Sequence, residues 1–338
     1  MKILILKPSS LGDVVHALPV LRLLRRHLPK SEIHWWIDSN LSPLLEADPD
    51  LTGVVRFERR RWTSPLRWPE MWRSIQWLRA QQFDWVIDLQ CLARSAAFAW
   101  LANGKLTIGL DEPREGARGF YDLIIPRATG PVHAVDRYLA VLPALNVPVD
   151  WNFTWLPERP TEAEAVRTKW LAGPAPRIAL QPGARWLNKR WPIEHFVELV
   201  RLLAAQSADT RFLIMGSSDD RPLGDLLAAV APERSMNLAG KTSLPEMVEC
   251  LRRCAMLVTN DSGPMHVAAA LGKPVIALFG PTDPRRTGPY GQLARTLQHP
   301  LPCVPCLKSN CRNAQPLECL KMISPAMVFE RVRQLLPS

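Results

Sequence analysis

The first hundred residues alternate between short apolar runs and helical patterns. Strand-length apolar runs occupy residues 3–6, 32–37 and 85–89. Between the first two, residues 12–28 have apolar side chains at helical spacing, at Val15, Leu18, Leu21, Leu24 and Leu28. Pro19 interrupts this pattern, so the helix is expected to kink there or to begin later. With a further helical run at 93–102, this alternation predicts a parallel sheet with crossover helices.

The rhythm breaks at a proline-rich segment and then starts again. Residues 147–176 contain five prolines and a short helical run at 162–171. Strand-length runs return at 178–180, 212–215, 256–259 and 275–279. We therefore expect a first domain at 1–150, a linker at 151–176 and a second domain at 177–338, whose last helix is able to pack back on the first. Two doubly wound α/β domains that face each other would bind ligands in the cleft, beyond the carboxyl ends of their strands.

Composition limits the class of protein. A chain of 338 residues with 47% hydrophobic and 22% charged residues is long enough for two globular domains. The formal net charge of +10 favours an anionic partner, such as nucleic acid, a phosphorylated lipid or a small phosphorylated molecule, and solubility alone explains it about equally well. The sequence shows no secretory signal pattern and no apolar run of about 18 residues. We therefore expect a cytoplasmic protein whose seven cysteines are thiols or metal ligands.

A polar loop follows the first predicted strand. It contains Ser10, Gly12 and Asp13, and the helix begins within it. Gly12 allows a substrate to approach the backbone closely. Asp13 projects from a strand end toward the expected cleft, where it can act as a general base. Taken alone, Asp13 is more often a residue that caps the helix.

Two loops of the second half also follow predicted strands. Residues 259–274 pass from a strand into a helix that starts near Gly263, and a helix start with a glycine is an anion site. Asp261 can hydrogen-bond sugar hydroxyls or orient this loop, and His266 can reach a phosphate oxygen. In the loop 181–192, Lys189 or Arg190 can neutralise a departing diphosphate. The plainer interpretations are an ordinary capped turn and a solvated basic loop.

Other nucleotide-binding signatures are missing from the sequence. There is no G-x-x-x-x-G-K-[ST] segment and no intact G-x-G-x-x-G after the first strand. This absence argues against phosphoryl transfer and against dinucleotide-dependent oxidoreduction.

Arginine and tryptophan are interleaved in residues 54–79. The arginines are Arg56, Arg59, Arg60, Arg61, Arg67, Arg73 and Arg79, and the tryptophans are Trp62, Trp68, Trp72 and Trp77. Arginine binds phosphate and carboxylate with two hydrogen bonds, and tryptophan suits a membrane interface. Anionic lipid, an acidic substrate and nucleic acid are all candidate partners. The alternative is a solvated amphipathic helix whose tryptophans face the core.

Four of the cysteines lie close together near the end of the chain. Cys303, Cys306, Cys311 and Cys319 have the spacing C-x2-C-x4-C-x7-C. Four thiolates can form a tetrahedral site for a structural Zn or Fe ion. The alternative is a group of structural thiols.

Taken together, these segments resemble glycosyltransferase family nine, the heptosyltransferases of lipopolysaccharide core assembly, over nearly the whole chain. The opening residues 7–19 are similar to the first motif of that family, and residues 259–282 look like its donor-site motif. Residues 59–62, 86–96 and 133–137 look like the heptosyltransferase I branch, which adds the first heptose to the 3-deoxy-octulosonic acid (Kdo) sugars of lipid A. Cys91 stands where the family pattern has glycine in the acceptor loop, and Ala184 and Arg185 stand where relatives have hydroxyl residues near the diphosphate.

The resemblance implies a GT-B fold, with two facing Rossmann-like domains that bind the acceptor in the first and the nucleotide in the second. It implies an inverting transfer from ADP-L-glycero-β-D-manno-heptose to a Kdo-lipid A acceptor, with no catalytic cofactor and with Asp13 as the base. The donor residues would be Lys189, Asp261, Ser262, Gly263 and His266, with Asp219 near the ribose. The acceptor residues would be Ser10, Gly12, Arg60, Arg94 and Arg114. The enzyme would be cytoplasmic, in peripheral contact with the anionic inner membrane, and no nucleic acid is expected to bind.

Other functions remain open from the residues alone. A nucleic-acid-binding protein would use the arginine and tryptophan residues, and its affinity would fall steeply with salt. A non-catalytic nucleotide-sugar binder would bind the donor without turnover. An epimerase of the same fold would change the donor in the absence of an acceptor. A related transferase would use another nucleotide sugar or acceptor.

Overall fold

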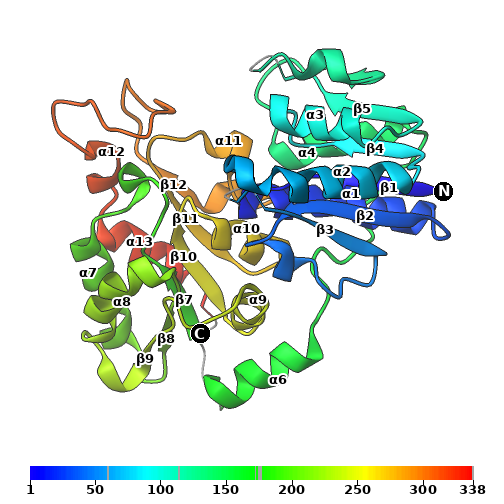
Figure 1. Ribbon diagram of the computed structural model, residues 1–338. Helices are drawn as coiled ribbons and strands as arrows, with labels where there is room; N and C mark the ends of the chain where they lie inside the picture. Colours follow the sequence, from blue (N-terminus) through cyan, green and yellow to red (C-terminus); the bar gives the residue numbers. More distant parts are fainter. Residues whose placement is uncertain (59–60, 113–114, 172, 174–176, 337–338) are drawn as a thin grey trace. The chain divides into compact units, whose positions relative to one another are not determined.

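The computed structural model describes residues 1–58, 61–112, 115–171, 173 and 177–336. It divides into two compact units, Met1–Pro157 (unit 1) and Glu158–Ser338 (unit 2). The division falls inside the proline-rich segment 151–176. Figure 1 shows strands and helices alternating along each unit.

Unit 1 is built on a parallel sheet. Its strands are β1 (Lys2–Leu6), β2 (Glu32–Asp38), β3 (Gly53–Phe57), β4 (Trp85–Asp88), β5 (Leu106–Leu110) and β6 (Leu123–Ile125). Its helices are α1 (Leu11–His27), α2 (Trp68–Ala80), α3 (Ala93–Leu101), α4 (Ala134–Leu139) and α5 (Val141–Ala144). Within the described residues the strand order is β3-β2-β1-β4-β5-β6, which is the order of a Rossmann sheet. Helix α1 begins at Leu11 and contains Pro19, so a later start is wrong.

The core of unit 1 has a layer on each face of the sheet. On one face, Leu4, Leu6 and Val86 pack against Ile75 and Leu78 of α2. Side chains alternate along a strand, so Ile3 and Ile5 point to the opposite face, and they are also fully buried. Burial of both faces explains why the strands read as continuous apolar runs in the sequence.

Unit 2 repeats this plan. Its strands are β7 (Arg177–Gln181), β8 (Arg211–Ile214), β9 (Ser235–Asn237), β10 (Met256–Asn260), β11 (Val275–Phe279) and β12 (Thr296–Gln298). Its helices are α6 (Pro160–Lys169), α7 (Ile193–Gln206), α8 (Arg221–Ala228), α9 (Leu244–Arg252), α10 (Gly263–Ala270), α11 (Pro284–Thr287), α12 (Glu318–Lys321) and α13 (Pro325–Arg333). In the part that the structure describes, the order β12-β11-β10-β7-β8-β9 is the same Rossmann order.

The last helix belongs to unit 2. Val328 and Val332 of α13 join the hydrophobic core formed by α7 and the strands, including Ile178 and Ile276. Packing of this helix on the first domain, which the sequence left open, stays a prediction. Among the described residues, none of the helices combines the length and apolar character that crossing a bilayer requires.

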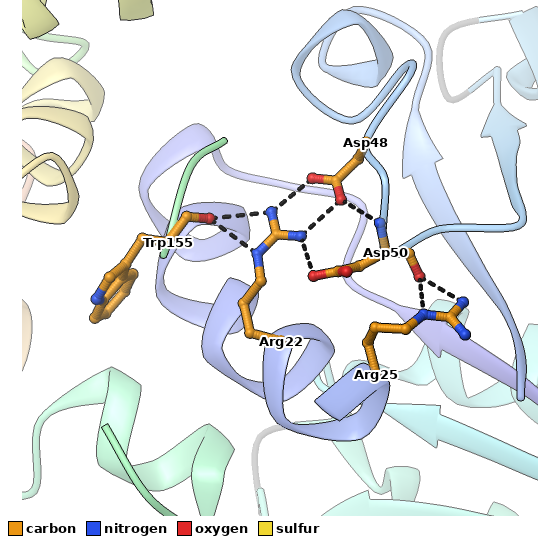
Figure 2. A network of polar contacts seen from close by, with 5 residues as sticks. All are labelled: Arg22, Arg25, Asp48, Asp50 and Trp155. Carbon is orange, nitrogen blue, oxygen red and sulfur yellow. Dashed lines mark hydrogen bonds and ion pairs between the residues drawn. The ribbon is translucent and has the colours of Figure 1, made fainter. Parts of the chain in front are cut away.

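A buried ion-pair network joins α1 to the last residues of unit 1 (Figure 2). Arg22 of α1 donates to both oxygens of Asp48 at 2.6 Å and to Asp50 at 2.7 Å. Its guanidinium also donates to the carbonyl oxygen of Trp155, at 3.0 and 3.1 Å. These bonds fix the last residues of unit 1 to α1, the helix that also carries Asp13.

Candidate active site

Asp13 lies in the first turn of α1, after the loop that follows β1. Ser10 precedes this helix, and its backbone N–H and hydroxyl group donate to Oδ2 of Asp13 at 2.9 and 2.7 Å. The hydroxyl group of Tyr138, from α4, lies 3.3 Å from Oδ1. Asp13 therefore stabilises the helix start, with Ser10 as the cap residue. Its Oδ1 accepts a long, weak hydrogen bond from Tyr138, which is compatible with accepting a proton.

Lys7 and Tyr138 are buried side chains close to Asp13. The ammonium group of Lys7 is buried, donates to the carbonyl oxygen of Leu89 at 3.1 Å and lies 4.6 Å from the centre of the Tyr138 ring. Burial lowers the pKa of Lys7, and the negative charge of Asp13 opposes that change. Burial, reinforced by the charge of Asp13, raises the pKa of Tyr138 well above its ordinary value. The phenol is therefore protonated and able to donate to Asp13.

A cavity opens in unit 1 beside this loop. It is lined by Pro8, Ser9, Trp36, Phe57, Gln90, Leu92, Arg94, Ser95 and Glu115. Of the expected acceptor residues, Arg94 lines the cavity, Ser10 follows Ser9 as the cap residue of α1, and Gly12 lies buried in the first turn of that helix. Arg60 and Arg114 lie outside the described residues.

The predicted donor lysine of unit 2 is held by a carboxylate. Lys189 Nζ lies 2.6 Å from Oδ2 of Asp261, and both side chains are largely buried. The hydroxyl group of Thr282 donates to the same oxygen at 2.6 Å. The Lys189 ammonium group also lies 4.8 Å from the centre of the Trp186 ring. The structure thus brings together two residues that the sequence suggested separately, and adds Thr282.

Asn260 joins the two loops that carry these residues. It is fully buried, accepts from the backbone N–H of Trp191 at 2.9 Å and donates to the carbonyl oxygen of Pro182 at 2.7 Å. Asn260 and Thr282 lie within the segment 259–282 that resembles the donor-site motif, but the sequence assigned no role to either, because their roles depend on contacts across more than 20 residues of chain. The signal for Asn260 was its place at the end of a buried strand, where an amide needs partners.

The remaining donor residues begin α10 and the loop after β8. Ser262 is the cap residue of α10, Gly263 is its first residue, and His266 lies buried in its first turn. Asp219 is exposed, whereas its neighbour Asp220 is buried and accepts from the backbone N–H and hydroxyl group of Ser217 at 3.0 and 2.8 Å. Of these two carboxylates, Asp219 is the one at the surface, and its contact with the donor ribose stays a prediction.

Most tryptophans of the arginine-rich stretch do not face the core, contrary to the alternative interpretation of this stretch. Trp68, Trp72 and Trp77 are exposed in α2, so for them that interpretation is wrong. Trp62 does pack inward, stacked on Phe98 with the ring centres 5.8 Å apart.

The four clustered cysteines line one small cavity in unit 2. Cys303, Cys306, Cys311 and Cys319 all contribute to its wall. Burial raises the pKa of Cys319, and the neighbouring thiols add to this effect. Across the described residues, however, no group of three or more potential ligands is placed to hold a metal ion. The spacing fits a metal site, and the placement of the side chains does not form one.

The sequence and the fold are similar to those of known glycosyltransferases. The sequence profile of glycosyltransferase family 9 (heptosyltransferase) matches residues 71–316. The lipopolysaccharide heptosyltransferase 1 of Pseudomonas aeruginosa is 34% identical, over 94% of this chain and 89% of its own length. Two Escherichia coli structures cover 99% of this chain. ADP-heptose LPS heptosyltransferase II has a TM-score of 0.79 at 28% identity over 98% of its length. Heptosyltransferase WaaC with ADP-2-deoxy-2-fluoro heptose has a TM-score of 0.78 at 26% identity over 100% of its length.

Two Rossmann-like units with these neighbours define a glycosyltransferase of the GT-B fold, which confirms the fold class predicted from the sequence. The chain belongs to glycosyltransferase family 9, the heptosyltransferase family.

Proposed function

We propose that the protein transfers L-glycero-D-manno-heptose from ADP-heptose to a Kdo-lipid A type acceptor in lipopolysaccharide inner-core biosynthesis. The observation that carries this proposal is the geometry of Asp13. One carboxylate oxygen fixes the start of α1, and the other accepts a long hydrogen bond from the hydroxyl group of Tyr138. The lipopolysaccharide heptosyltransferase names of the relatives, and the ADP-heptose analogue bound in one neighbour, support the choice of donor and pathway.

The proposed reaction is a single inverting displacement. The acceptor hydroxyl oxygen attacks C1 of the heptose, while its proton passes to Asp13. The bond between C1 and the phosphate oxygen breaks, and the electron pair leaves with ADP. Proton removal by a positioned carboxylate contributes roughly a factor of 10² to 10⁴ in rate. No metal or other cofactor takes part in this proposed step.

The proposed donor site lies in unit 2. Lys189 neutralises the charge that develops on the diphosphate as it leaves. Ser262, Gly263 and His266 bind its oxygens at the start of α10, where the helix dipole favours negative charge. Asp261 orients Lys189 and hydrogen-bonds sugar hydroxyls, and Asp219 contacts the ribose. The 2.6 Å contact between Lys189 and Asp261 supports the joint assignment of these two residues.

The proposed acceptor site lies in unit 1. Arg94 lines the cavity beside the loop of Asp13, and a guanidinium group suits the carboxylates of Kdo sugars. Ser10 and Gly12 would contact the acceptor through the loop itself, and Arg60 and Arg114 would add positive charge. A lipid-linked acceptor implies an enzyme at the cytoplasmic face of the inner membrane, in peripheral contact with anionic lipid. Nucleic acid has no part in this function.

A structural Zn or Fe ion at Cys303, Cys306, Cys311 and Cys319 stays a separate prediction. The shared cavity supports it, and the four thiols would have to draw together around the ion. It would stabilise the loop before α12 and supply no chemistry to the transfer.

Calorimetric titration of ADP-heptose beside UDP- and GDP-sugars tests the donor. Selective ADP-heptose binding is expected. Kdo-lipid A, and the same acceptor already carrying one heptose, are then added, and ADP release is measured. Release with Kdo-lipid A alone supports addition of the first heptose. Release only with the heptosylated acceptor moves the protein to a later step, and selective binding of another nucleotide sugar contradicts the assigned donor.

A further inference from the structure

Three large apolar side chains are exposed where the chain passes from β3 into α2. Leu66 is 88% exposed, Trp68 55% and Trp72 54%. Trp68 and Trp72 are four residues apart in α2, so they lie one turn apart on one side of the helix. We call these three residues the aromatic patch. A cluster of large exposed apolar side chains indicates a surface that binds another protein or a membrane.

The helix beneath the patch is firmly packed. Ile75 and Leu78 of α2 are buried in the core of unit 1, and Met71 packs against the same core. Trp62, just before the patch, stacks on Phe98. Ile75 and Leu78 thus anchor α2 to the core of unit 1. Trp68 and Trp72 are not needed to fill that core, so their side chains remain exposed on a well-packed helix.

Positive charge surrounds the patch. Residues 61–80 contain four arginines and one glutamate. Glu70 lies 2.6 Å from Arg67 and 3.3 Å from Arg61, so it neutralises one charge of the group. Arg61, Arg67, Arg73 and Arg79 are all exposed. An exposed helix with apolar aromatic residues and arginines matches a membrane surface that carries negative headgroups.

The patch lies at the functional edge of the sheet. In a parallel sheet, the loops after the strands and the starts of the following helices share the carboxyl edge. Leu66 and Trp68 follow β3 in this way, as Asp13 follows β1 and Arg94 follows β4. Phe57, the last residue of β3, lines the cavity that holds Arg94. Trp100 lies near the end of α3, hence toward the opposite edge, and is 59% exposed.

We propose that the aromatic patch docks the enzyme on an anionic lipid bilayer, with Trp68 and Trp72 in the headgroup region and Arg61, Arg67 and Arg73 against lipid phosphates. Charge complementarity selects this occupant over a second copy of a basic chain. Docking at the carboxyl edge brings a lipid-linked acceptor to the same edge as Asp13. This inference rests on the proposed function only for the statement that the acceptor is lipid-linked.

Vesicle cosedimentation tests the docking directly. The full-length protein is mixed with phosphatidylcholine vesicles with or without 30% phosphatidylglycerol, at low and moderate salt. Wild type is expected to bind the anionic vesicles, and Trp68→Ser/Trp72→Ser to lose about tenfold or more in affinity. Arg67→Gln/Arg73→Gln is expected to lose a similar factor, and more at low salt. Trp100→Ser, an equally exposed tryptophan toward the other edge, is the matched control and retains wild-type binding.

Other occupants give different results. The docking is overturned if wild type does not bind anionic vesicles, or if Trp68→Ser/Trp72→Ser binds them as wild type does. It is also overturned if the patch variants leave vesicle binding intact while they abolish self-association in sedimentation velocity, or while they abolish binding of a single-stranded oligonucleotide.

A transfer assay separates this inference from the proposed function. Kdo-lipid A in anionic vesicles is compared with a water-soluble Kdo oligosaccharide that has no acyl chains. The variant Trp68→Ser/Trp72→Ser is expected to lose about tenfold in rate on vesicles and to keep the wild-type rate on the soluble acceptor. Equal losses on both acceptors contradict docking. If wild type transfers heptose to neither acceptor, the proposed function fails, and vesicle binding still decides the docking.

Discussion

Oδ2 of Asp261 accepts from the Lys189 ammonium group and the Thr282 hydroxyl group, each at 2.6 Å. The lysine expected to bind the donor diphosphate is therefore already paired in unit 2. A bound diphosphate must therefore either share the Lys189 ammonium group with Asp261 or take the place of Asp261 as its partner. The pair fixes Lys189 at the end of β10, so the cation is positioned before the donor binds, which lowers the entropy cost of binding.

Replacement of Lys189 is expected to weaken nucleotide binding. Lys189→Ala should reduce the affinity for ADP by roughly 10- to 100-fold, since a hydrogen bond to a charged group contributes about 1.5–3 kcal/mol. Isothermal titration calorimetry measures the change. Arg201→Ala removes an exposed cation of α7 that pairs with Glu198 and is the control, with ADP affinity within about twofold of wild type.

Loss of Lys189 also leaves Asp261 buried without its cation. The double variant Lys189→Ala/Asp261→Asn removes both charges and separates the two effects. Weak ADP binding in a stably folded double variant supports direct contact between Lys189 and the diphosphate. Recovery of wild-type affinity in the double variant shows that the lysine serves only to neutralise Asp261.

Asp13→Asn is expected to lower kcat by roughly 10² to 10⁴ with little change in ADP affinity. The amide oxygen of asparagine can still accept from the Ser10 N–H group, so the first turn of α1 is preserved. Tyr138→Phe removes only a long hydrogen bond of 3.3 Å, and the expected loss in kcat is less than about tenfold. Steady-state ADP release measures both variants, and an Asp13→Asn enzyme with wild-type kcat contradicts the role of base.

Most of the central strands of both sheets were predictable because they are buried on both faces. The interior strand β5 was missed, since Thr107 and Gly109 interrupt its apolar pattern. The runs at 3–6, 256–259 and 275–279 coincide with β1, β10 and β11 to within a residue or two. The edge strands β6, β9 and β12 escaped notice because each has only three residues, and β9 and β12 also show no continuous apolar pattern. β3 was absorbed into the arginine-rich stretch, because its central residues are only half buried.

The site was predictable where one short segment supplies it and not where distant segments meet. Asp13 and Lys189 lie on loops after predicted strands, so topology alone directs them to a sheet edge. Tyr138 reaches Asp13 across 125 positions of sequence, and only the fold brings these two together. Cys91 shows a subtler case. Its φ of 54° is left-handed, a conformation that glycine adopts readily, and this agrees with the glycine that the family resemblance leads one to expect at this position.

Thiol content and metal content of the cysteine cluster are measurable together. If the four cysteines hold a structural ion, protein purified under reducing conditions contains about one Zn or Fe per chain by elemental analysis, and Cys306→Ser/Cys311→Ser contains none. Cys250→Ser/Cys254→Ser changes two buried cysteines outside the cluster and is expected to keep the metal. Substoichiometric metal in wild type argues for four structural thiols instead. Removal of the ion is expected to leave kcat unchanged while it lowers the thermal stability of unit 2.

Arg22→Ala is expected to destabilise unit 1 by about 3–5 kcal/mol, because it leaves the buried carboxylate of Asp48 without its cation. It also removes both bonds to the carbonyl oxygen of Trp155 (Figure 2). Urea unfolding followed by tryptophan fluorescence measures the loss. Arg26→Ala, one turn along α1, removes an exposed arginine near Asp150 and is the matched control, with a loss below about 1 kcal/mol.

Arg22→Lys covers the case in which the alanine variant does not fold. It keeps the positive charge and loses the planar group that bonds Asp48, Asp50 and Trp155 at once, so an intermediate loss of stability is expected. Arg22 lies nine residues after Asp13 on the same helix, and the two functions are separable. A folded Arg22→Lys enzyme should unfold at lower urea and keep near wild-type kcat below its unfolding transition. If its stability equals that of wild type, the network of Figure 2 does not hold the end of unit 1 in place.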